Sequence, residues 1–461
     1  MKNIIILFIP ILLFLTGCST HTTPLQSNFT MPYSYGDNSS SNKSNVDINW
    51  WKNFNSPTLV TLIEDAKKNS PDVLIAIESL EQARLTLENA GLAYYPTISS
   101  SASSSGTRTK PDGSSWSTSK STSGTVSISY ELDLWGKIAG QKEEANASYF
   151  ASKYSKDATM LSLYSSVATA YFNFLATNER LAIAKSNLEI SQKLMNVVNG
   201  QYKVGTVTAL DVYTQQTTLL NQQATVDGLE LSLKEYKNAL AILIGKTPQE
   251  FNTTNDDFWK LNLPTIEAGL PSELLLERPD IAKAREDVNS ANAATKVANA
   301  NRFPSFTLSA SGGISSASLL SFKDPTSTLS LGLSAAYTLL DWGNLKNLRD
   351  IEVSKTRSAI ATYNKTILTA LQETSDALNS VAYQKSQVVL QEDIVNFSQK
   401  SLEISESQYK HGTSDFTTLL NSQTSYFSAR DNLATQRLNH LNALITLYKV
   451  LGGGWDMDTE L

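Results

Sequence analysis

The sequence predicts an internally duplicated α+β fold, in which strands of membrane-crossing length alternate with very long helical hairpins. Three observations support this fold class. The hexapeptide QYKVGT at 201–206 returns as QYKHGT at 408–413. Two segments alternate apolar with small polar residues, and the stretch from Asn344 to His411 contains neither glycine nor proline.

The duplication extends over most of the chain. Matched residues lie 207 positions apart in the downstream part and 208 apart upstream, and one inserted residue explains the change. Examples are Tyr130 with Tyr337, Trp135 with Trp342, Gly245 with Gly452, and Pro96 with Pro304. Two copies of this length indicate a duplicated supersecondary unit rather than a solenoid. The predicted divisions are a signal peptide at 1–17, a lipidated N-terminal segment at 18–55, a first repeat at 56–250, a connecting segment at 251–272 and a second repeat at 273–455.

Each repeat is predicted to open with a helix, followed by two strands. An aspartate behind a proline starts the helices at 69–96 and 277–304, and a proline ends each of them. The segments 125–135 and 329–339 then alternate apolar and polar residues over the length of a transmembrane strand, about nine to eleven residues. The Ser-rich run 99–123 has the composition of a disordered linker, but its matched position in the second repeat favours a hairpin with a long exposed loop.

The rest of each repeat is predicted to be a helical hairpin. Apolar residues follow the 3,4 spacing of packed helices, and the helices break at the two hexapeptides. These are predicted to be reversal turns, with Gly205, Thr206, Gly412 and Thr413 at the tips farthest from the strands, because glycine accepts the backbone angles of a sharp turn.

The N-terminus is typical of an exported lipoprotein. An apolar run from Ile4 to Leu15 is too short for a spanning helix and reads as a signal peptide. The run ends in LTGC, and Cys18 is the only cysteine in the chain, which excludes an internal disulfide. The pattern resembles a bacterial lipobox and implies acylation of Cys18, including a fatty acid such as palmitate. A signal peptide with an incidental cysteine is the alternative.

Charge and motifs exclude several functional classes. The 461 residues carry a formal net charge of −6, which argues against nucleic acid as a partner. The sequence contains no nucleotide-binding loop, no nucleophile elbow and no cluster with metal-ligand spacing, and its three histidines are scattered. We therefore predict no enzymatic activity, no cofactor and no metal.

Four membrane strands per chain imply an assembly. An open sheet edge has no partner in lipid, so several copies must close a barrel. Two copies give eight strands filled by side chains, whereas three give twelve strands and room for a lumen. Polar inward residues such as Ser127, Ser129, Ser330 and Ser334 favour three copies.

Five segments together resemble the TolC-like outer-membrane channel factors of efflux pumps, in particular their lipidated NodT-type branch. They are WWKNFNSPTLVTLI (50–63), YELDLWGK (130–137), LLERPDIAKA (275–284), FPSFTLSASGG (303–313) and LGGGW (451–455). The resemblance covers nearly the whole mature chain. It implies a homotrimeric twelve-stranded β-barrel in the outer membrane of a Gram-negative bacterium, continued by an α-helical coiled-coil tunnel across the periplasm. It also implies a periplasmic adaptor at the helical tips and an inner-membrane pump, commonly of the resistance–nodulation–division type.

The resemblance further implies a constriction on the helices that follow the tips. By residue match, Asp211 and Tyr409 fall on lock positions of the family. Thr418 and Asn421 occupy positions that often carry acidic rings, so the constriction keeps its place but not its charge, with Asp415 nearby. The alternative is that these residues are solvated parts of a helix face.

The expected function is a passive exit duct for drugs or other small toxic compounds, as in multidrug resistance. Trp135 and Trp342 would anchor the strands at the membrane interface, where aromatic residues are enriched. The runner-up is a protein-secretion duct of the same fold that serves an ATP-driven type I exporter. A coiled-coil lipoprotein without membrane strands is disfavoured by the alternating segments.

Overall fold

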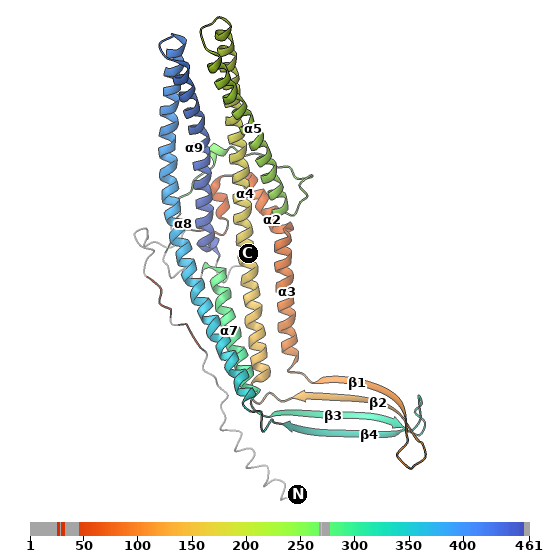
Figure 1. Cartoon of the computed structure of the whole chain (residues 1–461). Helices are drawn as coiled ribbons and strands as arrows, with labels where there is room; N and C mark the ends of the chain where they lie inside the picture. Colours follow the sequence, from red (N-terminus) through yellow and green to blue (C-terminus); the bar gives the residue numbers. More distant parts are fainter. Residues whose placement is uncertain (1–24, 28, 33–45, 267–268, 270–276, 456–461) are drawn as a thin grey trace. The chain divides into compact units, whose positions relative to one another are not determined.

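The computed structural model describes residues 25–27, 29–32, 46–266, 269 and 277–455 (Figure 1). The predicted signal peptide and Cys18 lie outside the described residues. The chain divides into two compact units. The first comprises Leu80–Ser152 and Ala284–Asn364 with residues 25–27, and the second comprises the described parts of Phe29–Ser79, Lys153–Lys283 and Lys365–Leu461. Each unit therefore draws on both sequence repeats.

The first unit contains one antiparallel sheet with the strand order β1-β2-β3-β4. The strands are β1 (Thr97–Thr109), β2 (Ser117–Glu131), β3 (Ser305–Ser316) and β4 (Thr326–Ala336). β1 and β2 form one hairpin and β3 and β4 the other, so the hairpin predicted for the Ser-rich run is confirmed. Among the residues that the structure describes, β1 and β4 each have a single neighbouring strand and leave an open edge.

The register of the sheet repeats the sequence duplication. Thr97 stands opposite Ser129 in the first hairpin, and Ser305 stands opposite Ala336 in the second. The residues of the second pair follow those of the first by 208 and 207 positions, the separations found in the sequence. The duplication has therefore preserved strand pairing residue by residue.

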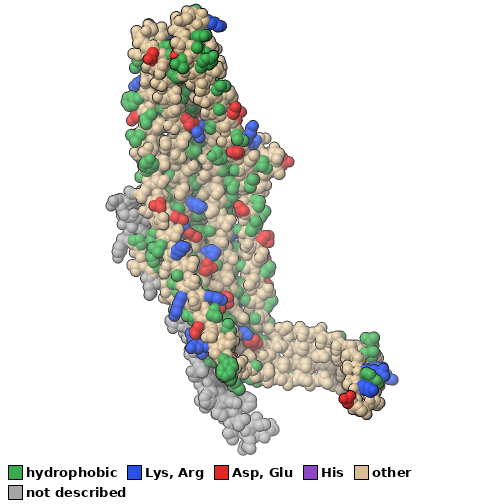
Figure 2. All heavy atoms as spheres, in the orientation of Figure 1, with side chains coloured by type: hydrophobic (Ala, Val, Ile, Leu, Met, Phe, Trp, Pro, Cys, Tyr) green, Lys and Arg blue, Asp and Glu red, His purple; other side chains and the backbone are tan. Residues whose placement is uncertain are grey.

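The two faces of the sheet differ in chemistry because strand side chains alternate. Ser99, Ser127, Ser311 and Ser330 stand opposite one another and form one row across all four strands. The other face exposes the apolar residues Val126, Ile128, Leu308, Leu329, Leu331 and Leu333. Figure 2 shows a sheet surface without charged side chains along its middle. The sheet is thus built to separate an apolar from an aqueous environment.

β2 and β4 end before the predicted limits at residues 135 and 339. The reason is an aspartate in each connection that caps the following helix. Asp133 accepts from two backbone N–H groups of the next helix, at 3.1 and 2.9 Å, and Asp341 accepts from one at 2.7 Å. Trp135 and Trp342 therefore lie in the connections after the strands rather than at strand ends.

The two predicted helical hairpins are confirmed. α4 (Lys137–Lys203) and α8 (Asn344–Lys410) have 67 residues each and supply residues to both units. They are followed by α5 (Ala209–Leu243) and α9 (Phe416–Val450), of 35 residues each. The helices that precede the strands are α3 (Pro71–Leu92) and α7 (Pro279–Ala300). Within the described ranges, no helix combines the length and apolar character needed to cross a bilayer.

The core of the second unit is largely aromatic. η1 (Trp50–Phe54) and α2 (Pro57–Asn69) pack there with parts of α4 and α9. Trp50 stacks on Tyr448 with ring centroids 5.0 Å apart, and Phe54 packs edge-on against Phe172 at 5.1 Å. A further short helix, η2 (Phe258–Lys260), adds the buried Phe258.

Matched glycines end the two hairpins with the same close contact. A Cβ on Gly245 would lie 2.2 Å from the carbonyl oxygen of Asn69, and one on Gly452 would lie 1.7 Å from that of Glu277. Gly453, in η4 (Gly452–Gly454), lies against Trp50. Three of the segments that carried the resemblance, around residues 50, 277 and 452, therefore meet in one core, which only glycine at these positions permits.

Candidate functional site at the helical tips and the strand edges

Both hexapeptide turns have the same backbone geometry. In each, the glycine N–H donates to the carbonyl three residues back, and the threonine N–H donates to the carbonyl five residues back. The two bonds measure 3.0 Å each for Gly205 and Thr206, and 3.1 and 2.9 Å for Gly412 and Thr413. This pair of bonds is a Schellman motif, which requires a left-handed residue. The glycines have φ values of 78° and 70°, so the predicted turns are confirmed.

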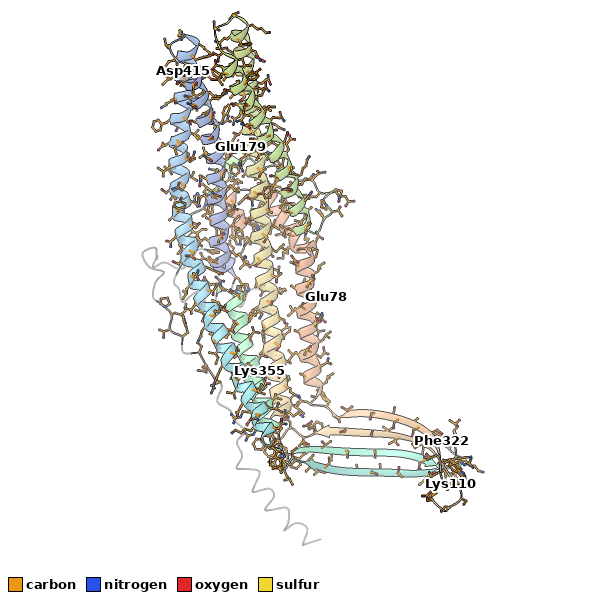
Figure 3. The ribbon with its side chains drawn as sticks, in the orientation of Figure 1. Glu78, Lys110, Glu179, Phe322, Lys355 and Asp415 are labelled. Atoms are coloured by element: carbon orange, nitrogen blue, oxygen red, sulfur yellow. The ribbon has the colours of Figure 1, made fainter. Side chains whose placement is uncertain are left out.

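The helices after the two turns, α5 and α9, both begin with a threonine and an aspartate three residues apart, but the order of the two residues is opposite in the two repeats. Thr208 caps α5: its Oγ1 accepts from the N–H of Asp211 at 3.4 Å, and the Asp211 carboxylate accepts from the N–H of Thr208 at 2.8 Å. The matched residues in the second repeat are Asp415 and Thr418, and here the aspartate accepts from the threonine N–H at 2.7 Å. Figure 3 labels Asp415 at this turn. Of the two predicted gate aspartates, Asp415 is therefore also the N-cap of α9, and Asp211 is the capping-box residue three positions after the N-cap of α5.

Tyr409 joins the two hairpins near their tips. Its hydroxyl donates to the side-chain oxygen of Gln201 on α4, and its ring centroid lies 6.0 Å from that of Phe416. Burial raises the pKa of Tyr409, the bond to Gln201 lowers it, and the charge of Asp211 raises it, with a net increase. The hydroxyl therefore remains a donor at neutral pH. The two lock positions predicted from the sequence, Asp211 and Tyr409, lie close enough to interact.

A cavity of about 540 Å³ lies between the hairpins beside this bond. Its apolar lining includes Ile190, Leu194, Val197, Leu402 and Leu419, and its charged lining includes Lys193, Glu406 and Lys410. Gln423 also lines it and is 2% exposed, and its side-chain oxygen has no hydrogen-bond partner within the described part of the chain. An apolar groove with a charged rim and a free acceptor suits a polypeptide partner better than an ion.

Thr418 and Asn421 lie on the exposed side of α9. They are three residues apart and so share one helix face, whereas Phe416 and Leu419 are buried on another. Ser425, four residues after Asn421, is exposed on the same face. This surface offers only hydroxyl and amide groups, as the sequence indicated.

An ion pair between the hairpins was missed by the sequence interpretation. Arg180 of α4 donates to both carboxylate oxygens of Asp431 on α9, at 2.7 and 2.9 Å. These hydrogen bonds raise the pKa of Arg180. Neither residue has a charged counterpart in the other repeat, so the duplication could not reveal the pair.

A buried arginine in the second unit was also missed. Arg278 is 8% exposed and forms ion pairs with Asp280 at 2.6 Å and with Glu373 at 2.9 Å. It also donates to the carbonyl of Val450 at 3.1 Å. Arg278 therefore ties the start of α7 to both α8 and α9, and the segment ERPD has a structural reason to be present.

The two predicted interface tryptophans differ in their surroundings. The ring of Trp135 stacks on Phe303 with centroids 5.0 Å apart, and its Nε1 donates to the carbonyl of Pro304 at 2.6 Å. Trp342, which follows the open edge strand β4, is 88% exposed. The two matched tryptophans thus differ: Trp135 packs against other residues of the chain and is called docked, whereas Trp342 is exposed and is called undocked.

Comparison with known proteins decides the family. A model of the outer membrane efflux protein family matches residues 62–246 and 270–453. The chain belongs to this family. The pyoverdine export outer membrane protein OpmQ of Pseudomonas aeruginosa is 33% identical to it over 100% of this chain and 98% of that protein. The toluene efflux pump outer membrane protein TtgC of Pseudomonas putida is 28% identical, over 96% and 93%.

Solved structures of outer-membrane channels share the fold. The channel OprN aligns with a TM-score of 0.85 and 24% identity, over 95% of this chain and 100% of that chain. The open state of the Neisseria gonorrhoeae MtrE channel aligns with 0.80 and 26%, over 96% and 99%. The fold class predicted from the sequence, a barrel-forming sheet continued by long helices, is confirmed.

Membership in the family establishes the broad function. The chain is an outer membrane efflux channel and not an enzyme, as the sequence predicted. Among the residues that the structure describes, no group of His, Cys, Asp and Glu could hold a metal ion. The lipidated branch, the adaptor and the pump stay predictions.

Proposed function

We propose that three copies of this chain form the exit duct of a tripartite efflux pump. The observation that carries the proposal is the sheet of the first unit, which has one hydroxyl-lined face, one apolar face and two open edges. Lipid cannot satisfy an open edge, so the sheets of several copies must close on one another. Three copies give twelve strands, which leave a lumen between the hydroxyl-lined faces.

The duplication supports a definite register for this closure. Within the chain, β2 pairs with β3 and Ser127 stands opposite Ser311. The residue 207 positions after Ser127 is Ser334 on β4, and the residue 208 positions before Ser311 is Ser103 on β1. We infer that Ser334 stands opposite Ser103 of the partner subunit. Both belong to the hydroxyl-lined face, as a closed barrel requires.

The same relation supports a docking site for Trp342. Trp135 docks on Phe303 and Pro304 within the chain, and the counterparts of these two residues in the first repeat are Tyr95 and Pro96. Tyr95 is 69% exposed in the single chain. We infer that Trp342 stacks on this tyrosine of the partner subunit, so that both tryptophans of the duplication are docked in the assembly.

Cysteine cross-linking tests the number of copies and the register together. The variant Ser103→Cys/Ser334→Cys should form disulfides between neighbouring copies, because directly opposite Cβ atoms lie about 4.5–5.5 Å apart. Denaturing, non-reducing gels should show two-chain and three-chain species and nothing larger, since the ring closes at three. Cross-linked species that end at two chains, or that include four or more chains, contradict the proposal.

Matched controls separate register from proximity. Ser103→Cys with Ser330→Cys places the second thiol four residues away along β4, about 13 Å off register, and should cross-link poorly. Each single-cysteine variant shows whether the introduced thiol forms disulfides with Cys18, the only native cysteine, or with its own counterpart in another copy. Efficient cross-linking of the shifted pair would mean that β4 and β1 meet in another register.

The helical tips are the proposed adaptor site. The apolar groove between α4, α8 and α9, with its charged rim, supports docking of a periplasmic adaptor there, next to the turns at Gly205–Thr206 and Gly412–Thr413. The adaptor would connect the duct to an inner-membrane pump of the resistance–nodulation–division type. A p-benzoylphenylalanine at Val197, which lines the groove and is 49% exposed, should photo-cross-link to the adaptor in intact cells. The same probe at Leu74 of α3, 51% exposed, is the control.

The proposed cargo is small molecules. Relatives of this chain are named for the export of pyoverdine and toluene. On the hydroxyl-lined face of the sheet, the charge of Glu131 is paired with Lys137, and the paired rows between the strand ends consist of small neutral residues, which would not sort solutes by charge. The runner-up is a protein-secretion duct for a type I exporter. Cells that lack this chain should become sensitive to toxic compounds with unchanged protein secretion. The opposite result favours the runner-up.

Acylation of Cys18 completes the proposed localisation, an outer-membrane channel with an additional lipid anchor. Several acyl chains on one residue hold a protein firmly at a membrane. The intact mass of the mature protein should include a diacylglycerol and an N-acyl group, and an unmodified Cys18 would refute the anchor. The strands should still insert in Cys18→Ala, because their insertion does not depend on the lipid.

Thr418 and Asn421 are the proposed constriction, with Asp211, Asp415 and Tyr409 around it. A ring of neutral side chains attracts cations only through dipoles, whereas carboxylates in a narrow tunnel attract them strongly. Divalent cations on the periplasmic side should therefore block single-channel currents weakly in the native protein and strongly in Asn421→Asp. Strong native block that persists when both aspartates are neutralised would place the constriction elsewhere.

A further inference from the structure

Cations gather where the two hairpins of the sheet turn. They are Arg108 on β1, Lys110 just after it, Lys120 on β2 and Lys323 in the β3–β4 loop. Figure 2 shows basic side chains at this end of the sheet. None of the ion pairs within the described ranges includes any of the four. Their positive charge is therefore available to a ligand.

Two of these cations belong to the apolar face of the sheet. Lys120 stands opposite Gly106 and, because side chains alternate, shares its face with Val126 and Ile128. Arg108, two residues beyond Gly106, lies on the same face, with its guanidinium 5.0 Å from the ring centre of Trp116. Lys120 is six residues from Val126, about 20 Å along the strand. The charges thus stand above the apolar band rather than on the hydroxyl-lined face.

The β3–β4 loop adds apolar groups beside these cations. Leu319 would approach a Cβ on Gly106 to 3.7 Å, and Phe322 would approach one on Gly124 to the same distance. Both glycines belong to the apolar face, so the loop lies over that face. Thr122 holds it there through a hydrogen bond of 2.7 Å to the loop backbone. Figure 3 labels Phe322 and Lys110 at this end of the sheet.

The connectivity gives this end of the sheet a place in the membrane. α3, α4, α7 and α8 all join the strands at the ends opposite the hairpin turns. In the proposed duct the helices are periplasmic, so the hairpin turns face the cell exterior. This inference rests on the proposed function in that respect. A cation on the lipid-facing side at the level of the headgroups is attracted to anionic lipid headgroups.

We propose that Arg108, Lys120, Leu319 and Phe322 bind an anionic lipid of the outer leaflet through its phosphate groups, the chemistry of lipid A. The guanidinium of Arg108 binds phosphate through paired hydrogen bonds, and Lys120 adds a second positive charge nearby on the same face. Leu319 and Phe322, which are 44% and 45% exposed, bury further surface against the acyl chains. The charged and the apolar parts of one lipid thus meet matching surfaces.

Native mass spectrometry of the detergent-solubilised assembly tests the proposal. Bisphosphorylated lipid A and its dephosphorylated form are titrated separately, and bound lipid is counted on the peak of the intact assembly. The wild type should bind the phosphorylated form at least about tenfold more tightly, since a charge-assisted contact is worth about that factor. Arg108→Gln/Lys120→Gln should bind both forms equally, and Arg108→Lys/Lys120→Arg should retain the preference.

Lys67→Gln/Lys68→Gln, which removes two exposed lysines from α2, is the matched control and should behave as the wild type. Excess inorganic phosphate should not displace the lipid, because it lacks the acyl chains. Equal binding of both lipid forms by the wild type, or an equal loss in the control variant, overturns the proposal. If three chains assemble but show no preference for the phosphorylated lipid, the lipid site is refuted and the proposed duct stands. If the chain forms no three-chain species, both the lipid site and the proposed duct are refuted.

Discussion

The two repeats share a turn, a strand register and a buried glycine contact, yet their matched side chains have different surroundings. Tyr409 bonds to Gln201 of the other hairpin, whereas Tyr202 is 49% exposed. Trp135 is docked on its neighbour, whereas Trp342 is 88% exposed. In both pairs the docked residue contacts the other repeat of the same chain. The difference teaches that matched residues are distinguished by their surroundings, and in the proposed duct we expect the undocked residue of each pair on the surface that meets the next copy.

The largest expected effect comes from the undocked tryptophan. Trp342→Ala should lower the resistance of the three-chain species to heating in detergent, because a buried interface tryptophan commonly contributes about 2 kcal/mol or more at each of three contacts. Trp135→Ala should instead lower the unfolding temperature of the chain. Gel assays over a temperature series, with circular dichroism of the same samples, separate the two. An assembly of Trp342→Ala as resistant as the wild type would break the comparison.

The two turns should respond equally to loss of glycine. Gly205→Val and Gly412→Val place a β-branched residue at positive φ, which costs about 1–2 kcal/mol. Urea unfolding followed by circular dichroism measures the change. Gly91→Ala is the control: this glycine lies in the last turn of α3, with nothing within 4 Å of an added Cβ. Alanine restricts the unfolded chain without strain in the folded one, so it should stabilise by about 0.4–1 kcal/mol. Unequal losses at the two turns would show that one tip is held by contacts the other lacks.

Tyr409 and its counterpart Tyr202 should have different hydrogen-bond partners in the single chain but equivalent ones in the proposed assembly. Tyr409→Phe removes the donor to Gln201 and should weaken the link between the hairpins by about 1 kcal/mol, with more frequent openings in single-channel recordings. By the repeat relation, Tyr202→Phe should act only where copies meet, through Gln408 of the partner subunit. If neither substitution changes the openings, the tyrosines do not hold the tip closed.

The smallest expected effect is a difference in acid sensitivity between the helix starts. Hydrogen bonds from Thr418 hold the pKa of Asp415 below its usual range. Its contribution to stability is therefore present above the unfolded pKa, about 3.9, and is lost as the pH falls through the lower folded value. At the start of α5 the N-cap residue is Thr208, whose hydroxyl does not titrate, and the carboxylate of the capping box belongs to Asp211. The comparison of the two helix starts is therefore made in an Asp211→Asn background. Hydrogen exchange at the start of α9 should accelerate in acid, after correction for intrinsic rates, and Asp415→Asn should abolish this response.

Much of the fold could be read from local sequence signals. The paired turns, the glycine-free helix and the alternating strands depend on periodicity and on backbone preferences, which act over a few residues. The strand limits at Asp133 and Asp341 were missed because a capping bond competes with strand pairing, and the sequence pattern does not rank the two. The ion pair of Arg180 with Asp431 was missed because its partners are 251 residues apart and unrelated by the duplication.

The sequence by itself determined the duplication, the fold class, the family resemblance and the places of the tips. These follow from local periodicity and from the spacing of repeated residues. Only the tertiary structure decided which member of each repeated pair is docked, and that Arg108, Lys120 and the β3–β4 loop share one face. The reason is physical: matched sequences form the same local structure, but a side chain's burial and partners depend on which element packs against it.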